Sequence, residues 1–100
     1  MGKNDFAKQV YDLVKKVPQG EITTYGRIAQ ALGRPKAARA VGNILHSNVS
    51  LKIPCHRVVN KKGRLALNFA HGGVKKQHEL LAKEGIKFKD KLHVILKKDV

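Results

Sequence analysis

Apolar side chains recur every three to four residues near the start of the chain, which is the spacing of one face of an α-helix. The residues of this face are Phe6, Val10, Leu13, Val14 and Val17. Asn4 or Asp5 is placed to cap the start of such a helix, and the run Pro18-Gln19-Gly20 is placed to end it. The pattern therefore predicts an amphipathic helix of roughly a dozen residues.

A second and a third apolar pattern follow, separated by a Gly-Arg-Pro break. Residues 25–32 carry a short apolar stripe that Thr23 or Thr24 can cap, and residues 36–45 form an alanine-rich stretch. Glycine suits a helix end and proline a helix start. A short helix, a tight turn and a second helix are typical of a helix-turn-helix, predicted here over about residues 24–47, although many helical hairpins share this pattern.

The second half of the chain has shorter apolar runs. Residues 57–59 and 64–67 flank the turn-forming sequence Asn-Lys-Lys-Gly, which predicts a small β-hairpin. Residues 74–84 have helical spacing and end at a glycine, and Phe88 with residues 92–96 indicates a short final strand or paired extension. Together these patterns predict a mostly α-helical fold with a small β-hairpin.

Composition narrows the class of protein. One hundred residues suit a single domain, residues 1–100, and a 42% share of apolar residues suffices for a small core. Apolar runs are too short to span a bilayer, so we expect no membrane contact. The single cysteine fits a reducing compartment, and the N-terminus has no apolar signal region, so we expect an intracellular protein.

The charge indicates a polyanionic partner. The chain has 21 Lys and Arg residues against 7 Asp and Glu residues, a net charge of +14. No carboxylate side chain lies between Glu21 and Glu79, whereas eleven basic side chains do. A bound phosphate backbone would relieve their mutual repulsion. The pattern therefore favours nucleic acid over a generally lysine-rich surface.

The single cysteine is a candidate nucleophile. Cys55 lies in the run Pro54-Cys55-His56-Arg57-Val58, and a thiolate forms more readily near positive charge or a base. Adjacent side chains need not face each other, so a buried structural cysteine beside a solvent-facing histidine is the other interpretation. The other four histidines show no metal-ligand spacing, and we expect neither a metal nor a cofactor.

The cysteine motif, residues 54–58, resembles the active-site signature of the O6-alkylguanine-DNA alkyltransferases, also called methylated-DNA–protein-cysteine methyltransferases. Residues 17–25 resemble the run into that family's helix-turn-helix, residues 36–42 its recognition helix, and residues 80–85 the helix that carries its acidic residue. The resemblance covers about residues 4–90 and only the family's C-terminal domain, as in short forms and alkyltransferase-like proteins. It implies the winged helix-turn-helix-like fold of that domain.

The resemblance implies repair by direct transfer of the alkyl group from O6-alkylguanine to Cys55. Such a methylated-DNA–protein-cysteine S-methyltransferase acts once, because the transfer consumes the protein. His56 would take the thiol proton through a water and would be oriented by Glu84. Tyr25 would donate a proton or a hydrogen bond to the guanine, and Asn48 would tie the recognition helix to the active-site turn.

The resemblance also implies a partner, double-stranded DNA containing O6-alkylguanine, bound by a monomer through the minor groove. The damaged base would be flipped out, with Arg39 filling the gap. The expected DNA contacts are Tyr25, Ala37, Ala38, Arg39, Gly42 and Arg57. The expected substrate pocket consists of Pro54, Val58, Asn68 and Phe69. A protein of this kind would be cytoplasmic and nucleoid-associated, or nuclear.

Two features depart from the family pattern. The loop of residues 67–73 is slightly longer than usual, with Phe69 in place of Tyr, and Gln77 stands where Lys is common. The loop resembles that of alkyltransferase-like proteins, which carry Trp or Ala in place of the cysteine and bind the lesion without removing it. Such a lesion-binding protein is the alternative to an active alkyltransferase, followed by a helix-turn-helix regulator. A cysteine hydrolase fits least, because no cleft for a peptide or amide is indicated.

Overall fold

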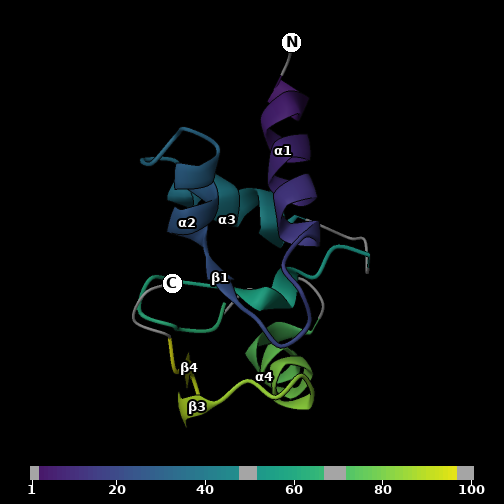
Figure 1. Cartoon of the computed structure of the whole chain (residues 1–100), viewed down its shortest axis with the longest axis vertical. Coiled ribbons are helices and arrows are strands. Elements are labelled where there is room, and N and C mark those ends of the chain that lie inside the picture. The colour runs from purple at the N-terminus through teal and green to yellow at the C-terminus, as the bar shows by residue number, and fades with distance from the viewer. Residues whose placement is uncertain (1–2, 48–51, 67–71, 97–100) are drawn as a thin grey trace.

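A helical half and a mixed half are joined by two short parallel strands (Figure 1). The computed structural model describes residues 3–47, 52–66 and 72–96. The elements in chain order are α1 (Lys3–Lys15), β1 (Thr23–Thr24), α2 (Tyr25–Ala31), α3 (Ala38–His46), the 3₁₀ turn η1 (Cys55–Arg57), β2 (Val58–Val59), α4 (Gly73–Lys83), β3 (Phe88–Asp90) and β4 (His93–Val94). The predicted fold class, mostly helical with a small hairpin, is confirmed.

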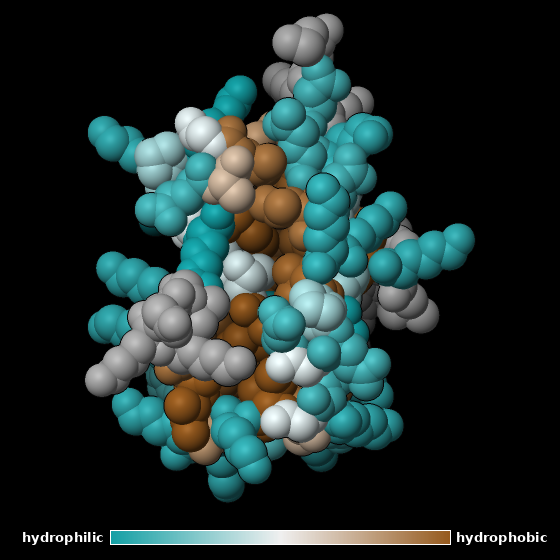
Figure 2. Space-filling view, in the orientation of Figure 1, coloured by the Kyte–Doolittle hydropathy of each residue, from teal (hydrophilic) through white to brown (hydrophobic). Residues whose placement is uncertain are grey.

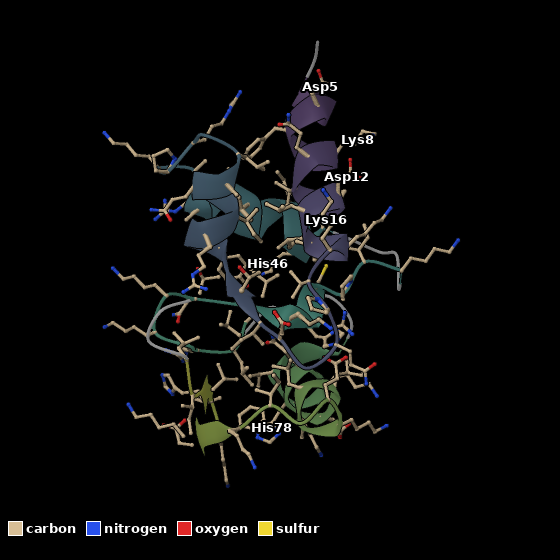
Figure 3. The ribbon with its side chains drawn as sticks, viewed as in Figure 1. Asp5, Lys8, Asp12, Lys16, His46 and His78 are labelled. Carbon is tan, nitrogen blue, oxygen red and sulfur yellow. The ribbon has the colours of Figure 1, made fainter. Side chains whose placement is uncertain are left out.

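The first helix has the two faces that its sequence predicts. Val10 and Val14 are fully buried, whereas Asp5, Lys8 and Asp12 lie along the solvent side (Figure 3). Lys8 Nζ and Asp12 Oδ2 are 3.1 Å apart, one helical turn from each other. This exposed ion pair adds a few tenths of a kcal/mol at most, so α1 is held mainly by its buried valines.

The helix starts confirm one predicted cap and correct the other. α1 includes Lys3, so Asn4 and Asp5 lie inside its first turn, and the prediction that either residue caps the helix is wrong. α2 begins after Thr24 as predicted, and Thr24 Oγ1 accepts a hydrogen bond from the backbone N–H of Arg27 at 3.1 Å. This bond satisfies one of the N–H groups that a helix start leaves without a partner.

The helices α2 and α3 lie where the helix-turn-helix is predicted and pack against α1. Their shared core consists of Val10, Val14, Ile28, Ala29, Val41, Leu45, Ile53, Cys55 and Val58. Tyr11 on α1 donates its phenolic hydrogen to the backbone oxygen of Ile44 on α3 at 2.9 Å. The last members of the core come from the cysteine motif, so the helical half is completed by residues far along the chain.

The strand pairing differs from the predicted hairpin. The turn of residues 60–63 is present, since Gly63 N–H donates to the Asn60 carbonyl oxygen. However, Val58–Val59 pairs in parallel with Thr23–Thr24, and Arg64 forms its bridge with His93. The predicted pairing of residues 57–59 with 64–67 is therefore wrong. Both valines of β2 are fully buried, as is typical of a strand covered on both faces. The partner of such a strand can come from a segment far away in the sequence, as β1 does here.

The mixed half has its own core under the antiparallel hairpin of β3 and β4. The buried residues of this second core are Val59, Leu65, Leu81 and Val94. The His78 ring on α4 stacks on the Phe88 ring of β3 with centroids 3.9 Å apart. Because Val58 belongs to the first core and Val59 to the second, β2 joins the two halves.

The surface mixes apolar and charged side chains. On the face shown in Figure 2, apolar side chains gather between α1 and α2 and continue below them, with hydrophilic side chains on either side. Among residues 3–47, 52–66 and 72–96, no helix has the length and apolar character needed to cross a membrane.

We expect Gly63→Ala to destabilise the chain more than Gly33→Ala does. Both glycines have positive φ, +85° and +75°, which costs an alanine about 1 kcal/mol. A Cβ at Gly63 would also lie 2.6 Å from the Val94 carbonyl oxygen, whereas one at Gly33 would meet nothing within 4 Å. Urea denaturation should give losses of about 3 and about 1 kcal/mol. Equal losses would contradict the close contact between the turn and β4.

Candidate active site

The cysteine motif forms a single tight turn between the two halves of the molecule. Cys55 N–H donates to the Ile53 carbonyl oxygen at 2.7 Å, and Arg57 N–H donates to the Pro54 carbonyl oxygen at 3.0 Å. The Cys55 side chain belongs to the first core and the residue is 7% exposed. The turn therefore carries a nearly buried thiol, and the next two residues in the chain supply an imidazole and a guanidinium.

Glu84, which caps the end of α4, binds the two side chains that follow the cysteine. Its Oε2 lies 2.9 Å from His56 Nε2. The Arg57 guanidinium donates two hydrogen bonds to the same carboxylate, from Nε to Oε1 at 3.0 Å and from Nη2 to Oε2 at 2.8 Å. Arg57 Nη1 donates to the Val17 carbonyl oxygen at 2.8 Å. We call Cys55, His56, Arg57 and Glu84 the candidate catalytic group.

The ionisation of Glu84 fixes the roles of the imidazole nitrogens. Burial would raise the pKa of Glu84, but hydrogen bonds from Arg57 and His56, the charge of His56 when it is protonated, and the positive charge of Arg57 lower it to about 2. The carboxylate is therefore ionised near neutral pH and can only accept hydrogen bonds. Nε2 of His56 then carries the hydrogen of the 2.9 Å contact, and Nδ1 of the neutral ring becomes the acceptor. An imidazole held in this way can take a proton from a thiol.

Tyr25, the first residue of α2, keeps its proton over the whole physiological range. Burial raises its pKa to about 12, and the negative charge of a Cys55 thiolate adds to the effect. The ring lies edge-on to His46 of α3, with centroids 6.3 Å apart. A Cβ at Gly42 would lie 3.8 Å from the same ring. Tyr25 is therefore a phenol held against α3 and suited to donate a hydrogen bond.

Comparison with known proteins shows the family to which the chain belongs. The family model described as "6-O-methylguanine DNA methyltransferase, DNA binding domain" matches residues 5–86. The chain belongs to this family.

Curated and solved relatives agree with the assignment. The chain is 41% identical to the methylated-DNA–protein-cysteine methyltransferase of Shigella flexneri, over 84% of this chain and 48% of that protein. It is 36% identical to alkyltransferase-like protein 1 of Schizosaccharomyces pombe, over 86% and 81% of the two chains. A crystal structure of that yeast protein with DNA containing O6-carboxymethylguanine superposes with a TM-score of 0.80 at 32% identity, covering 97% and 93%. The chain thus spans about half the length of the methyltransferases it matches.

Among the predicted site residues, His56 and Arg57 bind one carboxylate, Glu84. Cys55 directly precedes them in the same turn. Arg39 is exposed on α3. On the same helix Gly42 is buried against Tyr25, and Ala37 and Ala38 at its start are half-buried. The exposed arginine and the small residues thus belong to one short helical segment.

The structure bears on two predicted contacts. Arg57 is only 16% exposed, and its guanidinium binds Glu84 and Val17 inside the protein. Its predicted contact with DNA stays a prediction. Val58 is fully buried in the first core, so it supports the turn from below and does not line a substrate pocket. Pro54, directly before the cysteine, is half-buried.

Three predicted site residues, Asn48, Asn68 and Phe69, lie outside the described residues. Two partners of the site were not predicted from the sequence. One is the Val17 carbonyl group, because a backbone acceptor leaves no mark in a sequence. The other is the side chain of Gln77, which looks like a surface residue among its Lys, His and Glu neighbours. In the sequence, the only indication of a special role for Gln77 was that it stands where Lys is common in the family.

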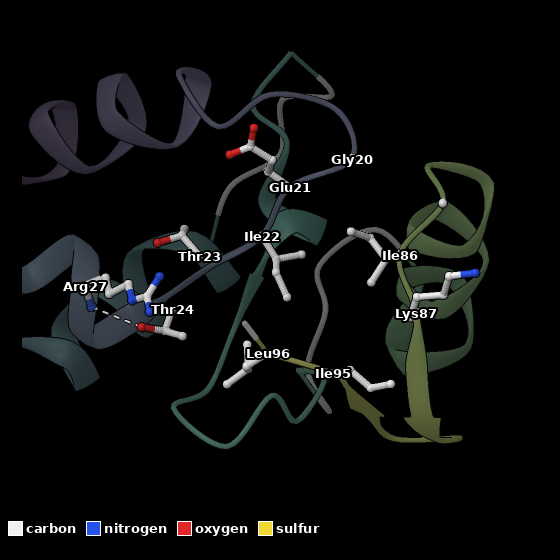
Figure 4. Close-up of a pocket in the computed structure, with 11 residues that line it drawn as sticks. Gly20, Glu21, Ile22, Thr23, Thr24, Arg27, Ile86, Lys87, Ile95 and Leu96 are labelled. Carbon is white, nitrogen blue, oxygen red and sulfur yellow. Dashed lines mark hydrogen bonds between the residues drawn. The ribbon is translucent and has the colours of Figure 1, made fainter. Parts of the chain in front are cut away.

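A large groove lies elsewhere and is not the catalytic pocket. It has a volume of about 610 Å³ and runs between the loop before β1 and residues 95–96. Ile22, Ile86, Ile95 and Leu96 lie around it (Figure 4). No member of the candidate catalytic group lines it. Within residues 3–47, 52–66 and 72–96, no cluster of three or more His, Cys, Asp or Glu side chains could hold a metal ion.

The depressed pKa of Glu84 predicts a loss of stability in acid. Because the pKa falls from 4.5 to about 2 on folding, the stabilisation is complete above about pH 4.5 and disappears as the pH drops toward 2. The shift corresponds to about 3 kcal/mol. Wild type should therefore lose about 3 kcal/mol more than Glu84→Gln between pH 5 and pH 2, measured by urea denaturation.

A matched control for this measurement is Glu79→Gln, on the exposed side of the same helix. This variant should keep the acid dependence of the wild type. If Glu84→Gln keeps it too, the ion pair with Arg57 does not stabilise the fold.

Proposed function

We propose that this chain repairs O6-alkylguanine in duplex DNA by transferring the alkyl group to Cys55, once per molecule. The observation that carries the proposal is the 2.9 Å contact between His56 and an ionised Glu84, in the turn that holds the only cysteine. Nucleophile, base and orienting acid are the three parts that activation of a weak nucleophile requires. Membership of the methyltransferase family supports the same reaction.

The proposed transfer balances in protons and electron pairs. His56 Nδ1 takes the thiol proton, through a water. The Cys55 sulfur attacks the alkyl carbon, so that a C–S bond forms as the C–O6 bond breaks and its electron pair goes to the guanine. Tyr25 donates a hydrogen bond to the base as that charge develops, which its pKa of about 12 suits. Overall the thiol proton ends on guanine, and the thioether on Cys55 is permanent.

The proposed DNA complex follows from the burial of the thiol. With Cys55 only 7% exposed, a base inside the helical stack cannot reach the sulfur, so the damaged nucleotide must be flipped out. The small residues at the start of α3 suit a close approach to the minor groove, with exposed Arg39 placed to fill the gap. The net charge of +14 supports binding to the DNA backbone, and we propose that the protein binds as a monomer. Such a protein acts where the genome is, in the cytoplasm of a prokaryote or in a nucleus.

A second candidate function is lesion recognition without transfer. The alkyltransferase-like protein of Schizosaccharomyces pombe, solved with O6-carboxymethylguanine DNA, matches this chain almost from end to end, whereas the Shigella methyltransferase is matched over about half its length. Cys55 argues against this function, because the resemblance implies Trp or Ala at that position in alkyltransferase-like proteins.

Mass spectrometry on the intact protein separates the two functions. After incubation with a duplex containing O6-methylguanine, we expect one added methyl group, located on the Cys55 peptide. His56→Ala should slow the transfer by about 10²-fold or more, because the base is lost. An undamaged duplex should leave the protein unmodified. Tight binding of the damaged duplex with an unmodified Cys55, and equal binding by Cys55→Ala, would sink the transferase proposal in favour of lesion recognition.

A further inference from the structure

We infer that Gln77 is a positioning residue that holds the active-site turn on α4. This inference rests on the proposed alkyl transfer for its effect on rate, but its structural part can be tested without that reaction. Gln77 lies in the middle of α4 and is fully buried. Burying an amide without hydrogen-bond partners would be costly in free energy. The partners of the Gln77 side chain therefore indicate why it is buried.

All the bonds of the Gln77 side chain lead to the cysteine turn or to the strand region beyond it. Nε2 donates to the His56 carbonyl oxygen at 3.0 Å and to the Val58 carbonyl oxygen at 3.1 Å. Oε1 accepts from the Ala66 N–H at 2.7 Å. One amide therefore uses both of its hydrogens on the backbone around the catalytic residues and joins that backbone to residue 66.

The turn needs such an anchor because it is too short to stabilise itself. η1 has three residues, and 3₁₀ turns of this length have poor hydrogen-bond geometry. Gln77 and Glu84 are seven residues apart, two turns of helix, and so lie on the same face of α4 about 10 Å apart along its axis. Glu84 binds the side chains of His56 and Arg57, while Gln77 binds the backbone carbonyl groups on either side of Arg57. Both contacts together fix where the imidazole stands.

The amide is chemically suited to this place in a way that lysine is not. A lysine donates hydrogen bonds but accepts none, so it could bind the two carbonyl groups while leaving the Ala66 N–H without its acceptor. It would also bring a positive charge close to His56. Glutamine satisfies all three backbone groups and adds no charge beside the base.

The test compares two substitutions at this position with a control on the same helix. Gln77→Met keeps the length of the side chain and removes all three hydrogen bonds, whereas Gln77→Lys keeps a donor for the two carbonyl groups. Leu81→Ala is the matched control, because Leu81 is fully buried on α4 but belongs to the second core and not to the first, which contains Cys55. Each protein is measured at a temperature where denaturation curves show it to be folded.

Two measurements report on the position of the active-site turn. The first is the single-turnover transfer rate at saturating duplex with O6-methylguanine, together with the duplex affinity. We expect Gln77→Met to transfer about 10- to 100-fold more slowly, since small displacements of a catalytic group cost rates of this order, with affinity unchanged within twofold. Gln77→Lys should fall between Gln77→Met and wild type, because it keeps donors for the two carbonyl groups but leaves the Ala66 N–H without an acceptor and adds a charge beside His56. Leu81→Ala should stay within a few-fold of wild type. The second readout is the nitrogen NMR spectrum of His56, in which Gln77→Met should lose the signal of an Nε2 hydrogen bonded to Glu84.

The outcomes separate this inference from the proposed function. If wild type transfers no alkyl group, the proposed function fails, and the His56 spectrum alone decides the role of Gln77. If Gln77→Met leaves that spectrum as in wild type, or transfers as fast as Leu81→Ala, the amide is only a core residue and the inference is wrong.

Discussion

The structure depends on one carboxylate that joins three distant parts of the chain. Glu84 receives hydrogen bonds from His56 and Arg57, and Arg57 continues the network to the Val17 carbonyl group. The end of α4, the cysteine turn and the loop after α1 are thereby held together. Glu84 is 11% exposed and Arg57 16%, so removal of either partner would leave a nearly buried charge without compensation, which typically costs 3–5 kcal/mol. Fold and site therefore share the same interaction.

The surrounding architecture serves to keep that network in place. β2 links the two cores, since its first valine packs in the helical half and its second in the mixed half. The turn that carries Cys55 directly precedes this strand, so the Cys55 thiol lies where the halves meet. α4 then supports the turn from one side through Gln77 and Glu84. A site at such a junction is rigid because both cores must deform before it can move.

Local sequence patterns predicted the helices and one cap, but not the contacts between segments that are far apart in the sequence. The helices follow from apolar periodicity, and the cap at Thr24 from its residue type. The grouping of His56 with Glu84 came from the family resemblance, because 28 residues separate them and no spacing rule joins them. The pairing of β2 with β1, the inward direction of Arg57 and the burial of Gln77 were not foreseen. Each depends on contacts between segments far apart, where a basic or amide side chain looks the same as one on the surface.

The bidentate arginine bears on the proposed role of His56 as a base. A lone buried carboxylate beside an imidazole stabilises the protonated ring, and a ring that already carries both protons cannot accept one from a thiol. Here Arg57 supplies the positive charge that balances Glu84, through two short hydrogen bonds. The carboxylate can then orient His56 through Nε2 without requiring the ring to be cationic. The arginine that the family resemblance assigns to DNA thus has a second proposed task, which is to let one acid hold the base in place while leaving it able to accept a proton.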